Sequence, residues 1–126
     1  MVDMESALII ETDLAFSKGI GYILEQEGFS ILYAYNIQDA RKIINSQELA
    51  LICMNQKIRG GEGIELAREL REKGIKTPIV MMSGYPAEKM EDLALQAGID
   101  KYFEKTKIPF KTLGKALATL VKEREM

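Results

Sequence analysis

The chain has no histidine and no tryptophan, and its 126 residues include a single cysteine, Cys53. Without histidine, the protein has no imidazole for acid–base catalysis, for activating a serine or cysteine nucleophile, or for ligating zinc or haem. One cysteine allows neither an internal disulfide nor a zinc site built from cysteines alone. Within an apolar run, Cys53 is expected to be an inert core residue. These absences exclude most familiar catalytic machinery.

Long apolar runs are missing as well. No stretch approaches the length that spans a membrane, and residues 1–5, Met-Val-Asp-Met-Glu, lack the basic region and apolar run of a signal peptide. We therefore expect a cytoplasmic protein that makes no membrane contact. At this length one domain is the expectation, covering residues 1–126.

The charge is nearly balanced overall but unevenly distributed. There are 17 basic and 19 acidic side chains, a net charge of −2, which argues against a general nucleic-acid binder. Residues 101–126 nevertheless carry seven Lys or Arg against three Glu. This excess predicts either a solvated basic face on the last helix or a docking surface that attracts an acidic partner electrostatically.

Short apolar runs alternate with amphipathic segments along the whole chain. The apolar runs predict strands at residues 7–10, 31–34, 49–54, 78–82 and 102–103. The helical patterns fall at residues 16–24, 37–44, 64–70, 90–97 and 113–121. Asp13 and Asn36 are the expected caps of the first two helices. Strict alternation predicts a parallel α/β sheet with helices on both faces.

Polar residues follow four of the five expected strands. In chain order they are Glu11, Thr12 and Asp13, then Asn55, then Ser83, and finally Glu104 and Lys105. Ligands of an open parallel sheet bind at the carboxyl ends of its strands, near the point where the strand order reverses. These residues are therefore the candidate site.

The spacing of these residues resembles that of response-regulator receiver domains over essentially the full length of the chain. Such domains carry two acidic residues after the first strand, a phosphate-accepting Asp after the third, and a Gly eight residues beyond it. Here Asn55 stands at the acceptor position and Gly63 lies eight residues further on. Ser83 and Lys105 occupy the family's hydroxyl and lysine positions, and Tyr102 its aromatic switch position. The resemblance implies a flavodoxin-like, three-layer (βα)5 sandwich whose parallel five-stranded sheet has the order 2-1-3-4-5.

The departures from the family pattern concern its chemistry. Asn55 has a neutral carboxamide, which is a poor nucleophile toward phosphorus. The acidic pair is reduced to Glu11 and Thr12, so Glu11 is the only matched carboxylate and at best a weak ligand for Mg²⁺. Arg59 and Thr106 stand where the family has Pro. We therefore expect a pseudo-receiver without metal or other cofactor that has lost phosphotransfer and is not an enzyme.

Two origins of Asn55 are compatible with the sequence. The first is natural loss of the acid, and the second is an Asp-to-Asn change engineered to block an active receiver. Thr12, Arg59 and Thr106 favour natural loss, because one designed change would not produce them.

The retained residues also have purely structural interpretations. Ser83 can satisfy backbone groups at the end of a strand. Lys105 can pair with Glu11 and Asn55, which we favour over phosphate sensing because the acceptor Asp is missing. Tyr102 is either a residue that rotates between buried and exposed states or a static aromatic on an edge strand.

We predict a phosphorylation-independent signalling module that acts by binding proteins. By the resemblance, residues 90–121, which comprise the fourth helix, fifth strand and last helix, contact a protein partner, an output domain or a second copy. The candidate surface residues are Tyr102, Lys107, Lys111 and Lys115. The ten elements leave no helix-turn-helix, so direct nucleic-acid contact is not expected. The chain is also compatible with the first domain of a longer regulator.

Two other functions are kept as alternatives. One is a conventional phosphorelay receiver represented here by an inactive variant. The other is a small flavin- or nucleotide-binding protein, although neither a Walker motif nor Gly-x-Gly-x-x-Gly occurs. The glycine-rich residues 60–63 lack the required spacing and lysine, and they are expected to form a flexible loop.

Overall fold

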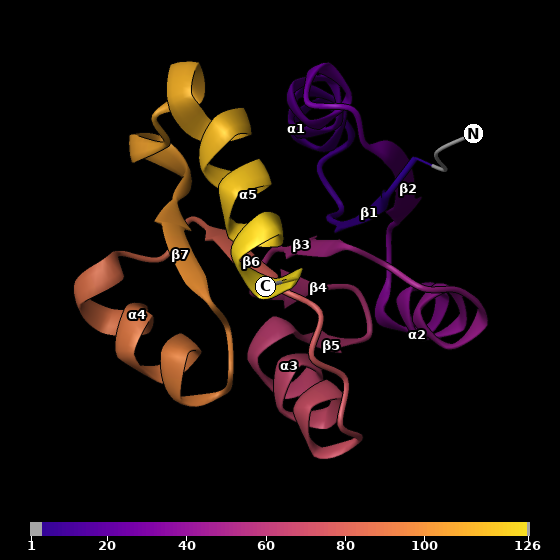
Figure 1. Ribbon diagram of the computed structural model, residues 1–126. Coiled ribbons are helices and arrows are strands. Elements are labelled where there is room, and N and C mark those ends of the chain that lie inside the picture. The colour runs from indigo at the N-terminus through magenta and orange to yellow at the C-terminus, as the bar shows by residue number, and fades with distance from the viewer. Residues whose placement is uncertain (1–3, 126) are drawn as a thin grey trace.

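The computed structural model describes residues 4–125 as a five-stranded sheet covered by helices on both faces (Figure 1). The outermost residues of the expected domain, 1–3 and 126, lie outside the described part. The sheet is built from β1 (Ser6–Ile10), β2 (Ser30–Ala34), β3 (Leu51–Met54), β6 (Ile79–Ser83) and β7 (Lys101–Glu104). The helices are α1 (Leu14–Gln26), α2 (Ile37–Ser46), α3 (Gly63–Glu72), α4 (Ala87–Gln96) and α5 (Phe110–Glu125).

All neighbouring strands of this sheet run parallel, in the order β2-β1-β3-β6-β7. Counting only the sheet strands along the chain, this order is 2-1-3-4-5, so the predicted α/β fold is confirmed. The chain reverses its direction of travel across the sheet between β1 and β3. A crevice at the carboxyl ends of these two strands is where such sheets bind ligands.

The two faces of the sheet pack into two separate apolar cores. Successive strand residues point to opposite faces, so Leu8 and Ile10 join the core beneath α2, α3 and α4. Ala7 and Ile9 join the core beneath α1 and α5. Figure 1 shows the same division, with α1 and α5 on one side of the sheet. Burial on both faces explains why the strands are continuous apolar runs.

The predicted caps form at both helices. The side chain of Asp13 accepts a hydrogen bond from the Phe16 amide at 3.1 Å, at the start of α1. Asn36 accepts one from the Asp39 amide at 2.7 Å, at the start of α2. Each bond satisfies an amide that has no partner within its helix, which is why the chain turns into a helix at these points.

The glycine-rich segment after β3 forms a hairpin, and the expectation of a loop there is wrong. Its strands are β4 (Lys57–Ile58) and β5 (Gly61–Glu62), which pair antiparallel. Gly60 makes the turn with a φ of +91°, a conformation that favours glycine. The Ile37 amide donates to the carbonyl of Arg59 at 2.9 Å, so the hairpin is anchored to the start of α2.

Two expected boundaries also shift by one residue. Ser83 and Glu104 are the last residues of β6 and β7, whereas both were expected just beyond their strands. Beyond β7 the chain forms a single 3-10 turn, η1 (Lys105–Lys107), before α5 begins. Within residues 4–125, none of the helices combines the length and the apolar character needed to cross a membrane.

Candidate functional site

The Glu11 carboxylate lies at the centre of the candidate site, just beyond β1. Its side chain is 3% exposed, and both of its oxygens accept hydrogen bonds or an ion pair. The Oε2 atom accepts from the amides of Thr12 at 2.8 Å and Asp13 at 3.1 Å. The Oε1 atom lies 2.5 Å from the Lys105 ammonium. A buried carboxylate needs such partners, because leaving its charge unpaired in the protein interior is costly.

Asn55 extends this arrangement from the end of β3. Its Nδ2 atom lies 3.4 Å from Glu11 Oε2 and donates to the Lys57 carbonyl at 3.2 Å. Its Oδ1 atom accepts from the Gln56 amide at 2.9 Å. An amide suits these neighbours because its NH₂ group faces two acceptors. A carboxylate at this position would face the Glu11 carboxylate and a carbonyl oxygen without a proton to donate.

Lys105 reaches the site from η1. Its ammonium lies 4.4 Å from the centre of the Phe16 ring, which is a cation–π distance, while the same ammonium pairs with Glu11. The side chain retains 23% exposure. Lys105 is therefore held by Glu11, which follows β1, and by Phe16 of α1.

The two hydroxyl residues of the predicted pocket are placed differently. Thr12 is exposed, and its backbone amide rather than its side chain contacts Glu11. Ser83 is fully buried, and its Oγ atom accepts from the Tyr85 amide at 3.1 Å. The structure thus brings Glu11, Asn55 and Lys105 together. The hydrogen bond between Ser83 and the Tyr85 amide instead holds the loop between β6 and α4.

The donor set fits Mg²⁺ poorly. Mg²⁺ needs an octahedral set of oxygens and usually uses carboxylates, waters and phosphate. Glu11 already accepts from Lys105 and two backbone amides, and Asp13 is engaged as the cap of α1. Among residues 4–125, no group of three or more His, Cys, Asp or Glu is placed to hold a metal ion.

Tyr102 lies on β7 with its ring buried, 8% exposed. Its hydroxyl donates to the Tyr85 carbonyl at 2.6 Å. Burial raises the pKa of Tyr102, and a hydrogen bond with Ser83 offsets only part of that effect. The inward ring therefore joins β7 to the loop that precedes α4.

Glu104 makes a second connection between β7 and α4, which the sequence did not reveal. Its Oε1 atom accepts from the Ala87 amide at 2.6 Å, at the start of α4. That hydrogen bond lowers the pKa of Glu104, and the nearby Lys107 lowers it further. Lys107 Nζ lies 3.4 Å from Glu104 Oε2. Lys111 and Lys115 are exposed on α5.

Gln56 is a further residue that sequence reasoning missed. It is 7% exposed, and its Oε1 atom accepts from the Ile64 amide at 2.9 Å in the first turn of α3. Its Nε2 atom donates to Glu62 at 3.2 Å. Gln56 thus caps α3 from a distance of eight residues, outside the local spacing that identifies helix caps.

Comparison with known proteins assigns the family. The response regulator receiver domain profile matches residues 7–118, so the chain belongs to that family, a signalling module of two-component systems. It is 30% identical over 118 residues to the phosphate regulon transcriptional regulatory protein PhoB of Pseudomonas aeruginosa. That alignment covers 92% of this chain and 52% of PhoB, so the chain spans about half the length of this relative.

Solved structures agree with the fold. A CheY-like response regulator receiver domain protein from Methanospirillum hungatei superposes with a TM-score of 0.87 at 24% identity, covering 98% of both chains. A two-component response regulator from Clostridium difficile gives a TM-score of 0.85 at 28% identity, covering 96% of this chain and 98% of that one. The geometry around Glu11, Asn55 and Lys105 is thus set within a receiver scaffold.

Proposed function

We propose that this receiver domain is a pseudo-receiver, which signals by protein binding without forming an aspartyl phosphate. The observation that carries the proposal is the set of contacts made by the Glu11 carboxylate. Its carboxylate is buried and already accepts from Lys105 and two backbone amides. The groups that would otherwise serve a metal and a phosphoryl group therefore satisfy one another.

The residue at the acceptor position supports the same conclusion. Forming an acyl phosphate requires a carboxylate oxygen that attacks phosphorus, and the Asn55 carboxamide is a poor nucleophile. The Asn55 side chain is also occupied, because it donates to the Lys57 carbonyl and accepts from the Gln56 amide. The site therefore has a structural role in this proposal.

The proposed contact surface consists of α4, β7 and α5. Two leucines of α4, Leu93 and Leu95, are exposed by 46% and 47%. Lys107, Lys111 and Lys115 add positive charge from η1 and α5. Exposed apolar side chains and basic side chains on these elements suit an acidic protein partner, an output domain or a second copy. PhoB is described as a transcriptional regulatory protein and is about twice as long as this chain, which favours an output domain following the receiver.

In this proposal, binding of the partner itself regulates the receiver. A partner that binds one arrangement of the surface more tightly shifts the receiver toward that arrangement. Tyr102 is the proposed moving part, because its hydroxyl bond to Tyr85 links β7 to the loop before α4. The extent of the domain, residues 1–126, is a prediction that accompanies this proposal.

The direct test uses beryllofluoride and acetyl phosphate, each with Mg²⁺, added to the ¹⁵N-labelled protein. We expect no saturable chemical shift changes at Asn55, Ser83 or Lys105 and no increase in mass with acetyl phosphate. Saturable changes centred on these residues would overturn the proposal.

Restoring the acid separates natural loss from an engineered block. We expect Asn55→Asp alone to remain unphosphorylated by acetyl phosphate, because Thr12 still replaces the second acidic residue. The matched variant combines Asn55→Asp with Thr12→Asp, which supplies both missing carboxylates. Labelling of the single variant would instead favour a conventional phosphorelay receiver that carries one inactivating change.

A further inference from the structure

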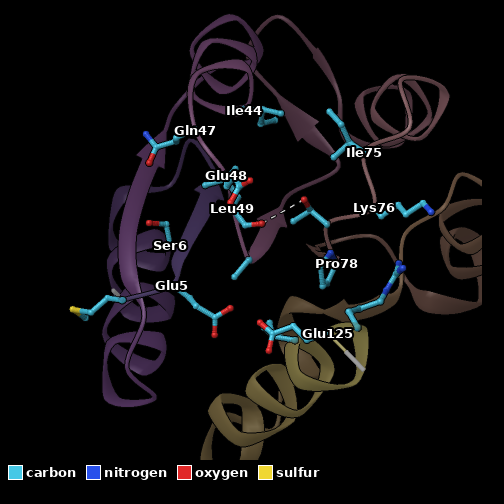
Figure 2. Close-up of a pocket in the computed structure, with 15 residues that line it drawn as sticks. Glu5, Ser6, Ile44, Gln47, Glu48, Leu49, Ile75, Lys76, Pro78 and Glu125 are labelled. Carbon is cyan, nitrogen blue, oxygen red and sulfur yellow. Dashed lines mark hydrogen bonds between the residues drawn. The ribbon is translucent and has the colours of Figure 1, made fainter. Parts of the chain in front are cut away.

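A cleft lies at the opposite edge of the sheet from the candidate site, where the strands begin (Figure 2). Its volume is about 670 Å³, within the range of small-molecule sites. Four segments border it: the start of β1, the segment from the end of α2 to β3, the segment before β6, and the end of α5. None of its lining residues belongs to the candidate site described above.

Apolar side chains line much of this cleft. Pro78 and Val121 are buried, and Ile44, Leu49 and Ile75 are half-buried. The Thr77 hydroxyl donates to the Leu49 carbonyl over a long 3.5 Å, which is the dashed contact in Figure 2. A ligand with an aliphatic part would remove apolar surface of these walls from water, which is favourable.

Three exposed glutamates and two cationic residues, Lys76 and Arg124, line the cleft. Glu5, Glu48 and Glu125 all line it, and Figure 2 shows the Glu5 and Glu125 side chains turned toward each other. A hydrogen bond with the Glu125 side chain raises the pKa of Glu5, and partial burial and the charge of Glu125 act in the same direction. Two carboxylates that face each other disfavour each other's ionisation, and a cation beside them would favour the charged form of both.

Within residues 4–125, neither of the two cations that line the cleft forms an ion pair with these glutamates. The Arg124 guanidinium lies 2.6 Å from Asp100 Oδ1, so its charge is engaged elsewhere. The Lys76 side chain extends away from Glu5 and Glu125 (Figure 2). None of the ion pairs found among residues 4–125 includes a glutamate of the cleft.

We propose that this cleft binds a linear aliphatic amine, with one ammonium group between Glu5 and Glu125 and the methylene chain against Leu49 and Val121. An ammonium group carries three donors, enough to reach both carboxylates. A bare divalent ion fits less well, because no described group of three acidic, His or Cys side chains could hold one. The apolar wall also gives such an ion nothing to contact.

The test is a titration of the ¹⁵N-labelled protein with 1,4-diaminobutane at constant ionic strength. We expect saturable shifts at Ser6, Leu49 and Val121. Glu5→Gln and Glu125→Gln should each weaken binding at least tenfold, because each removes one of the two carboxylates. Glu123→Gln is the matched control, since it removes the same charge from α5 outside the cleft. The neutral analogue 1,4-butanediol should not bind.

Three results would overturn the proposal. The first is equal weakening by Glu123→Gln and Glu125→Gln, which would mean that the amine only screens surface charge. The second is an equivalent set of shifts with magnesium chloride alone. The third is tighter binding of the peptide acetyl-Leu-Lys-Leu-amide than of diaminobutane, which would assign the cleft to a lysine side chain of a partner protein.

Discussion

Lys105 and Glu11 form an ion pair whose two members differ in their access to water. The Lys105 Nζ lies 2.5 Å from Glu11 Oε1, and the side chains are 23% and 3% exposed. Glu11 therefore depends on Lys105, whereas Lys105 still has contact with solvent. Removing the lysine would leave the buried Glu11 charge without its counter-charge, and an uncompensated buried charge strongly destabilises the folded state.

We expect Lys105→Met to lower the free energy of unfolding by about 2 kcal/mol, less than for a fully buried pair because Lys105 is partly exposed. Adding Glu11→Gln should cost less than the sum of the single changes, with a coupling of about 1 kcal/mol or more. Urea unfolding measures both. The control is Lys107→Met, whose ion pair with Glu104 leaves its own side chain 76% exposed and should contribute little. Equal losses in the two lysine variants would contradict the expectation.

The hydroxyl of Tyr102 gives a second prediction. Tyr102→Phe removes the 2.6 Å bond to the Tyr85 carbonyl but keeps the buried ring, so we expect a loss of about 1 kcal/mol in stability. Amide shifts should concentrate between Ser83 and Ala87. Tyr85→Phe serves as the control, because the acceptor there is a backbone carbonyl that the substitution retains. An unchanged loop spectrum in Tyr102→Phe would show that the bond is absent in solution.

Glu104 predicts a dependence on pH. The pKa of Glu104 is lowered in the folded protein, mainly by the hydrogen bond from the Ala87 amide. The ionised carboxylate is therefore more favourable in the folded state than in the unfolded state. The stabilisation is present above the ordinary carboxyl pKa and is lost as the pH falls through the lowered value. Glu104→Gln should therefore lower the melting temperature at neutral pH and have no such effect in strong acid. A difference in melting temperature that stays constant across this range would exclude the charge as its cause.

Ser17 predicts a stabilising substitution. It is fully buried in α1, and its Oγ atom has no hydrogen-bond partner among residues 4–125. Ser17→Ala removes this unsatisfied group and improves helix propensity, so we expect a gain of about 0.5–1.5 kcal/mol. Ser83→Ala is the matched comparison, because Ser83 is equally buried but accepts from the Tyr85 amide. That variant should lose about 1 kcal/mol. Thermal unfolding distinguishes the two signs.

The parts of the fold that local chemistry determines could be predicted from the sequence. Asp13 and Asn36 cap helices through bonds that span three residues, so their spacing was visible in the chain. The strand order followed from the resemblance to receiver domains, and the position of Glu11 beside Lys105 followed from the same source.

The contacts that were missed join segments far apart in sequence. Glu104 caps α4 from β7, seventeen residues away. Gly21 lies inside α1, where a Cβ atom would come within 2.1 Å of the Tyr33 hydroxyl on β2. Local sequence patterns do not predict such contacts, because the contacts depend on how the helices pack against the sheet. The hairpin after β3 was missed for a related reason, since its strands have only two residues each.

The filled pocket around Glu11 has a consequence for timing. A phosphorylated receiver carries its signal only while the acyl phosphate survives hydrolysis. In the proposed function, the groups around Glu11 are the Lys105 ammonium and the Asn55 amide of the chain itself, and no acyl phosphate forms. The signal therefore has no lifetime set by hydrolysis. Its strength would be set by how many copies of the domain the cell makes and degrades relative to its partner.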